Sequence, residues 1–341
     1  MSHLYLAHSE PDGTLAKAAL EALAASLQLA TELGAPLTVG LIGEHPATAA
    51  AAIVGCGADK ILTVTGPEFG QARYATDAAA AEALCRAAGA TLVTVAATSR
   101  WNRVLPGVAH RLGGRADTHV TGIAVADGKP AVSRWFYRQR MEAVFTRSTR
   151  PWLLALEGGI ASAAAVASSH APAPIANLTV EPAAPRTRVT GLEAPASDQQ
   201  TIRPDADLLF VTGAGWTKKQ ADGQVKVAEA EILIRDFLRL SRSSLGSTKS
   251  LVDLGGEGQS VLPFLSHLNQ VGQTGSTPRH AKGLSTCCHG EEPHTVGWRF
   301  IGERRAISLD ANCGWARGKA DILYIADAFA VMKQVNVLLA Q

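Results

Sequence analysis

Short apolar runs alternate with longer alanine-rich segments through the first 112 residues, and this alternation restricts the fold more than any other feature. The apolar runs predict strands at 3–7, 36–42, 60–64 and 91–96, and the longer segments predict helices at 15–33, 47–55, 76–88 and 103–112. Thr14 is placed to cap the first helix, and Gly34 to end it. Strands that alternate with helices of this length form βαβ units around a parallel sheet.

The residue pattern changes after residue 118. Strand-like pieces at 131–137 and 142–146 indicate an antiparallel addition to the sheet. Residues 157–206 are rich in Ala, Pro and Ser, which favours an extended connector with one strand near 175–180. We therefore predict an N-terminal α/β domain over 1–160, a connector over 161–203 and a C-terminal α/β domain over 204–341.

The last third of the chain predicts a smaller α/β unit with many loops. Its expected strands are 208–212, 306–309 and 322–325, and its expected helices are 225–240 and 329–339. In the first of these helices, Ile232, Leu233, Phe237 and Leu240 fall roughly on one stripe, which predicts its buried face.

Composition excludes several classes of protein. A net charge of +2 gives no sign of nucleic-acid binding, and no apolar run is long enough for a membrane helix. The first residues lack the basic and apolar regions of a signal peptide. The five cysteines are scattered and odd in number, which argues against a disulfide framework and for a reducing compartment. We expect a cytoplasmic protein.

A glycine loop at Asn269–Gly275, NQVGQTG, is the strongest local motif. Its two glycines flank an amide and a hydroxyl, so backbone N–H groups and two polar side chains can approach a ligand closely. Most clusters of this composition are only turns. The neighbouring motifs are needed to decide between the two interpretations.

The order of motifs resembles the electron-transfer flavoprotein α subunit over nearly the whole chain. The most specific match is QVGQTG, which is intact at 270–275. The other motifs support the resemblance by their order and spacing. In the second half these are VTGAGWT at 211–217, TKSLVDLG at 248–255, HGEEPH at 289–294, AISLD at 306–310 and ADAF at 326–329. In the first half, LYLAHSEPDGTL and RVLPGVAHRLG parallel the family's first strand with its turn and a later helix.

This resemblance implies a nucleotide-hydrolase-like parallel N-terminal domain, which contacts a β subunit, and a doubly wound FAD-binding C-terminal domain. It implies an electron carrier with no catalytic residue of its own, serving a partner dehydrogenase and a quinone-linked acceptor. AMP in the partner β subunit and an amine or N-methyl dehydrogenase as donor are further suggestions. The implied FAD-binding residues are Gly215, Thr248, Lys249, Gln270, Val271, Gly272, Gln273, Thr274, Gly275, His289, Gly290, His294, Ser308 and Asp327.

Several positions depart from the family pattern. Gly215 replaces the arginine of the glycine loop, and Lys249 replaces a second arginine, keeping the charge but losing the planar fork. Glu291 and Glu292 are acids near a site that must hold two phosphates. The alternative is therefore a non-redox scaffold subunit that has lost or altered FAD binding.

Two other clusters carry competing interpretations. Cys287, Cys288 and Cys313 are candidates for a metal or an iron–sulfur cluster, although their spacing matches no common pattern and buried free thiols are favoured. The basic and aromatic segment SRWFYRQR at 133–140 is either a half-exposed strand or a protein interface. Neither interpretation of this segment is favoured by sequence.

Overall fold

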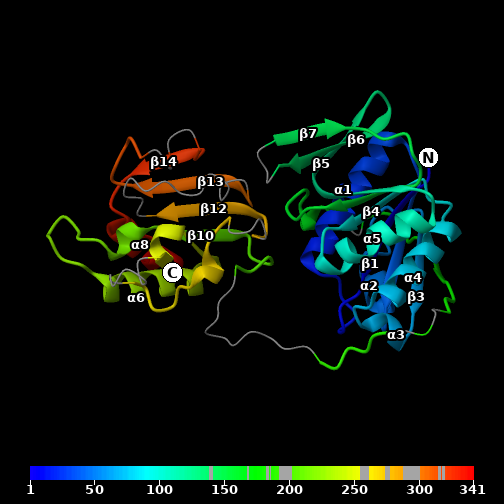
Figure 1. Cartoon of the computed structure of the whole chain (residues 1–341), viewed down its shortest axis with the longest axis horizontal. Coiled ribbons are helices and arrows are strands. Elements are labelled where there is room, and N and C mark those ends of the chain that lie inside the picture. Colours follow the sequence, from blue (N-terminus) through cyan, green and yellow to red (C-terminus); the bar gives the residue numbers. More distant parts are fainter. Residues whose placement is uncertain are drawn as a thin grey trace. The chain divides into compact units, whose positions relative to one another are not determined.

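A computed structural model describes residues 1–137, 141–166, 169–181, 184, 186–191, 202–253, 261–272, 277–286, 300–313, 316 and 319–341. The chain divides into two compact units, Met1–Leu192 and Glu193–Gln341 (Figure 1). Each unit contains a sheet with helices, so the predicted α/β class is confirmed. The predicted domain limits at residues 160 and 203 stay a prediction. None of the described helices is long and apolar enough to cross a bilayer.

The N-terminal unit is built on sheet A, whose described strands run in the order β7-β6-β5-β8-β4-β1-β2-β3-β9. Strand β6 pairs antiparallel with both β5 and β7, and all other neighbours pair parallel, which confirms the predicted antiparallel addition. The elements are β1 (His3–His8), α1 (Lys17–Leu33), β2 (Leu37–Gly43), α2 (Pro46–Ile53), β3 (Lys60–Thr65), α3 (Pro67–Gly70), α4 (Tyr74–Ala87), β4 (Leu92–Ala96), α5 (Ser99–Arg111), β5 (Arg115–Ala126), β6 (Lys129–Phe136), β7 (Met141–Phe145), β8 (Trp152–Leu156), η1 (Ala163–Ala165) and β9 (Ile175–Asn177).

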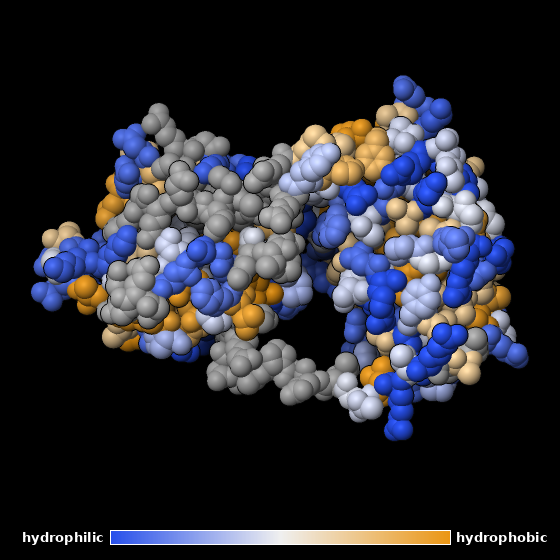
Figure 2. All heavy atoms as spheres, in the orientation of Figure 1, coloured by the Kyte–Doolittle hydropathy of each residue, from blue (hydrophilic) through white to orange (hydrophobic). Residues whose placement is uncertain are grey.

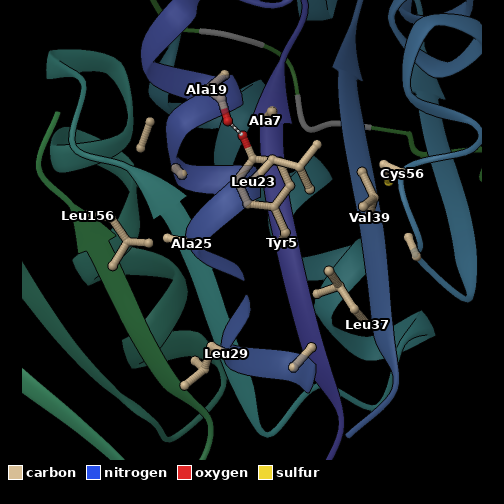
Figure 3. Packing of buried hydrophobic residues seen from close by; sticks show 14 of the residues in the cluster. Tyr5, Ala7, Ala19, Leu23, Ala25, Leu29, Leu37, Val39, Cys56 and Leu156 are labelled. Carbon is tan, nitrogen blue, oxygen red and sulfur yellow. Dashed lines mark hydrogen bonds between the residues drawn. The ribbon is translucent and has the colours of Figure 1, made fainter. Parts of the chain in front are cut away.

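The alanines of α1 let this helix pack closely on sheet A. Leu23 and Leu29 of α1 belong to one buried cluster with Tyr5 of β1 and Val39 of β2 (Figure 3). The Tyr5 hydroxyl donates to the backbone oxygen of Ala19 at 2.5 Å, so the largest polar group of this cluster is satisfied by the helix. A second cluster fills the opposite face of sheet A beneath α4 and α5.

Two helix starts differ from prediction, each for a local reason. The Thr14 hydroxyl donates to Asp12 at 2.7 Å and stabilises a turn, so α1 begins only at Lys17 without a side-chain cap. Helix α5 begins at Ser99, earlier than predicted, because the Thr98 hydroxyl accepts from the backbone N–H of Trp101 at 3.2 Å. A threonine cap therefore occurs at α5, although sequence placed it at α1.

The C-terminal unit is built on sheet B, whose described strands run in the order β11-β10-β12-β13-β14, all parallel. The elements are β10 (Leu208–Thr212), η2 (Ala214–Thr217), α6 (Val227–Ser241), β11 (Ser244–Ser247), α7 (Lys249–Asp253), η4 (His267–Asn269), β12 (His280–Thr286), β13 (Ile301–Ser308), β14 (Ile322–Ile325) and α8 (Ala328–Leu339).

The predicted buried stripe of α6 is partly wrong. Leu233 and Phe237 are buried, but Ile232 is 62% exposed, and Ala230 and Ile234 complete the buried face instead. The buried positions 230, 233, 234 and 237 follow the helical repeat, and position 232 falls on the opposite side. Helix α6 packs against α8 over sheet B.

Candidate cofactor-binding site

The carboxyl edge of sheet B is the place where the topology predicts a ligand. All five described strands are parallel, so their carboxyl ends lie along one edge. The chain runs from β10 through α6 to β11, and then returns past β10 to form β12 on its other side. Ligands of open parallel sheets bind at such a switch point, outside the carboxyl ends of the strands. Here the switch point lies between β10 and β12.

The predicted site residues that the structure describes gather at this edge. Gly215 follows β10, Thr248 and Lys249 follow β11, Ser308 ends β13, and Asp327 lies between β14 and α8. The segment 270–272 lies beside the end of β11, because Gln270 forms a parallel β-bridge with Ser247. The remaining predicted residues, Gln273, Thr274, Gly275, His289, Gly290 and His294, lie outside the described part of the chain.

The turn after β10 is anchored in the core by Trp216. Its indole N–H donates to the Thr286 hydroxyl at 2.8 Å, and its ring lies 4.6 Å from that of Phe329 between centroids. Gly215 is buried, and its backbone oxygen accepts from the Gln220 amide at 3.0 Å. The position where the resemblance expects an arginine is therefore part of a closed turn. Sequence reasoning gave neither Trp216 nor Thr286 a role.

Three buried oxygens at this edge have no hydrogen-bond partner among the described residues. They are Ser247 Oγ, Thr248 Oγ1 and Gln270 Oε1, which come from adjoining positions of β11 and the glycine loop. An unpaired buried polar group costs about 1–3 kcal/mol, so such groups usually face a ligand or ordered water. Two hydroxyls and an amide oxygen suit a ligand with both donors and acceptors, as FAD has in its ring edge and ribityl chain. These residues fit that group.

The glycine loop is shaped by its first glycine. Gly272 has φ of +83°, a left-handed conformation that glycine adopts without strain, and its N–H donates to the Thr277 hydroxyl at 2.8 Å. This bond ties the two ends of segment 273–276. Val271 packs against Gly246 so closely that a Cβ there would lie 2.5 Å from the Val271 side chain. Gly246 is therefore favoured by the close approach of Val271 to β11, and Gly272 by its left-handed backbone conformation.

Two predicted ligand contacts already have partners within the protein. The Lys249 ammonium lies 3.0 Å from the Asp253 carboxylate, which also lies 3.8 Å from His267. The Asp327 carboxylate accepts from the N–H of Phe329 at 2.8 Å and caps α8. The positive charge of Lys249 is therefore paired at this edge, and the nearby carboxylate of Asp253 offsets much of its electrostatic potential.

The N-terminal unit has its own polar cluster after β1. Arg100 donates to the buried Asp77 at 2.6 and 2.9 Å, and His8 Nε2 lies 3.4 Å from the same carboxylate. Burial lowers the pKa of His8. Burial alone raises the pKa of Asp77, but the neighbouring His8 and the hydrogen-bonded Arg100 outweigh it and hold that pKa below its usual range. Arg100 pairs with Asp77 in this cluster, and none of the predicted site residues belongs to it.

The described residues contain no group of three or more side chains that could hold a metal ion. Cys313 is fully buried. Cys287 and Cys288 lie outside the described part of the chain. The predicted metal interpretation therefore gains no support from the described residues.

Part of the chain matches a known protein family. A family model described as the electron transfer flavoprotein domain matches residues 3–183, which is more than half of the chain and includes β1 through β9. A search of curated proteins finds no match to the sequence. With more than half of its length matched, the chain belongs to the electron transfer flavoprotein family.

Proposed function

We propose that this chain is the α subunit of an electron-transfer flavoprotein and carries electrons through FAD bound at the carboxyl edge of sheet B. Membership of the family supports an electron-transfer flavoprotein-like role, and members of the family are flavoproteins generally. The observation that carries the proposal is the group of buried oxygens of Ser247, Thr248 and Gln270, which have no hydrogen-bond partner within the described part of the chain. They lie in and beside the segments that resemble the family's flavin-binding motifs.

In this proposal the chain's own residues bind and orient the cofactor. The Thr248 hydroxyl can donate or accept, and Gln270 Oε1 accepts from an N–H or O–H of the ligand. The closed turn at Gly215 and the turn at Gly272 bring backbone close to the ligand. Bound FAD supplies the electron chemistry, by accepting electrons from one protein and passing them to another.

The partners are also part of the proposal. The flavin chain would work as a heterodimer with a β subunit, which can carry AMP. Its donor would be a dehydrogenase, with an amine or N-methyl dehydrogenase as the suggested kind, and its acceptor would be linked to the quinone pool. These partners follow from the resemblance of the motifs.

The test is the flavin content of the protein purified with the partner encoded by the neighbouring gene. We expect flavin absorption bands and FAD released on denaturation, close to one per complex. Thr248→Val and Gln270→Leu should each weaken FAD binding by about five-fold to a hundred-fold, since each removes one buried hydrogen bond worth about 1–3 kcal/mol. Ser9→Ala is the matched control, because its hydroxyl is also buried and unpaired among the described residues but belongs to the N-terminal unit.

The scaffold alternative is favoured by two observations at the same edge. Gly215 offers no cation to the phosphates, and the Lys249 charge is held by Asp253. A wild-type complex that forms with its partner but stays colourless after incubation with FAD would establish the scaffold role and refute flavin binding.

A further inference from the structure

The positive charge of the chain is concentrated in one segment. Residues 129–150 contain six lysines and arginines and a single acid, Glu142, for a net charge of +5. The whole chain carries only +2, so the remaining residues together carry −3. This segment includes β6, β7 and the basic-aromatic sequence SRWFYRQR. Long-range attraction at this segment therefore favours an acidic partner.

Strand β7 is an exposed edge of sheet A. It pairs with β6 on one side, and no strand of the described residues pairs with its other side. Its apolar side chains are open to solvent: Val144 is 72% and Met141 47% exposed, and the adjoining Tyr137 is 75% exposed. Figure 2 shows apolar side chains gathered where the ends of β6 and β7 lie in Figure 1.

The strand itself lacks the features that usually protect an edge. Natural edge strands are blunted by proline, by bulges or by charged side chains. Strand β7 contains no proline, and its one charged residue, Glu142, accepts a hydrogen bond from the Thr121 hydroxyl at 2.6 Å. The register of β6 against β7 runs without a bulge from Val132–Phe145 to Phe136–Met141. An extended segment can therefore add to this edge by backbone hydrogen bonding.

The aromatic rings behind this edge favour a polypeptide over a nucleic acid. The Arg134 guanidinium lies 5.0 Å from the centroid of Phe136, and that of Arg147 lies 5.1 Å from the centroid of Phe145. Trp152 is fully buried. Binding of single-stranded nucleic acid needs free ring faces on which bases stack. Of the described aromatic residues at this edge, Tyr137 alone is largely exposed, and Arg134 and Arg147, which lie over Phe136 and Phe145, also pair with Asp117 of β5.

We propose that the open edge of β7 binds an extended acidic segment of another protein, which adds to β7 as a further strand. The backbone of β7 supplies the pairing, Val144 and Met141 supply apolar contact, and the net positive charge of residues 129–150 attracts the carboxylates of the segment. This inference does not depend on flavin binding.

The probe is a fluorescein-labelled peptide of about eight residues in which valine and glutamate alternate, a length typical of one strand. Its counterpart replaces every glutamate with lysine. We expect the full-length chain to bind the Val/Glu peptide in anisotropy titrations, with an affinity that falls as salt is raised. Val144→Glu should weaken binding at least about ten-fold, because it opposes like charges across the new strand pair. Ile232→Glu, at another largely exposed aliphatic position on α6, is the control and should leave binding unchanged.

Hydrogen exchange distinguishes strand addition from loose charge attraction. On saturation with the peptide, backbone amides within Met141–Phe145 should exchange at least about ten-fold more slowly, while those of β9 at the opposite edge should not change. The proposal is overturned if no Val/Glu peptide binds at about 1 mM, or if the Val/Lys peptide binds equally well. Tighter binding of a single-stranded oligonucleotide that Val144→Glu abolishes would replace it with a nucleic-acid site. A wild-type dimer that Val144→Glu dissociates would replace it with self-association.

Discussion

Replacing Asp117 with leucine should destabilise the N-terminal unit substantially. The Asp117 carboxylate is 1% exposed and accepts from Arg134 at 3.1 Å, from Arg147 at 2.5 and 2.8 Å, and from the Trp152 indole at 2.8 Å. It therefore joins β5 to β6, to β8 and to the segment after β7. Removing one partner of a buried ion pair costs about 3–5 kcal/mol.

The lower part of that range is expected for Asp117→Leu, about 3 kcal/mol. The two arginine side chains are 25% and 39% exposed, so they regain water when the carboxylate is lost. The Trp152 indole cannot regain water, because Trp152 is fully buried and its N–H loses the Asp117 carboxylate as acceptor. That single unpaired donor accounts for about 1–3 kcal/mol of the loss.

The assay is urea unfolding of the full chain combined with hydrogen exchange resolved by strand. Amides of β5, β6 and β8 should lose protection, while those of β12 in the other unit act as an internal control. A double-mutant cycle with Trp152→Phe should show a coupling of about 1 kcal/mol, because the second change removes the orphaned donor. A loss below about 0.5 kcal/mol, typical of a surface position, would refute the reasoning.

The same carboxylate should make stability depend on pH. Burial alone raises the pKa of Asp117, but hydrogen bonds from Arg147 and Trp152 outweigh it and hold that pKa below its ordinary value. The unfolded chain then binds a proton at a higher pH than the folded chain does. The stabilisation is complete above the ordinary carboxyl pKa, about 4, and is lost as pH falls through the lower, folded value. Asp117→Leu should lack this acid-side loss, and identical profiles for the two proteins would contradict the assignment.

Three further predictions concern single contacts. Thr98→Ala should cost about 1 kcal/mol by removing the cap that accepts from Trp101, measured by urea unfolding, whereas Thr98→Ser should cost little. Trp216→Phe should cost about 1–2 kcal/mol by leaving the Thr286 hydroxyl without its indole donor, and equal stability would contradict that bond. Burial lowers the pKa of His3 to about 3, so stability should fall as pH drops from about 6.5 toward 3, with a slope of up to about 1.4 kcal/mol per pH unit. His3→Gln should flatten this slope, and an unchanged slope would show that another group titrates.

Much of the N-terminal unit could be predicted because its elements satisfy local rules. Apolar runs such as Leu37–Gly43 are buried on both faces of a parallel sheet, and they read as strands without any knowledge of their partners. The helices between them carry enough alanine to pack closely. The exact start of α1 was wrong because a threonine can satisfy a turn as well as a helix, and only the neighbouring Asp12 decides between the two.

The C-terminal unit was harder because its strands depend on their neighbours. Strands β11, with sequence SLGS, and β12, with sequence HAKGLST, are short and weakly apolar, and neither was predicted. They are strands because β10, a buried apolar run, pairs with both. The strand tendency of such segments is set by cross-strand packing more than by the residues themselves.

The candidate site shows the same division. The motifs QVGQTG and TKSLVDLG could be recognised in the sequence, since their residue types and order do not require coordinates. The position of Ser247 beside these motifs could not be predicted from the sequence. It follows from the pairing of β11 with β10 and from the bridge between Ser247 and Gln270.

The sequence by itself therefore determined the α/β class, the parallel sheet of the N-terminal unit and the order of the flavin-like motifs, because these depend on periodicity and local residue types. Only the tertiary structure decided that Asp253 pairs with Lys249 and, among the described residues, which polar groups remain without partners and that β7 is left as an open edge. Those properties depend on distances between residues remote in sequence, and on which backbone edges and oxygens the packed chain leaves unsatisfied.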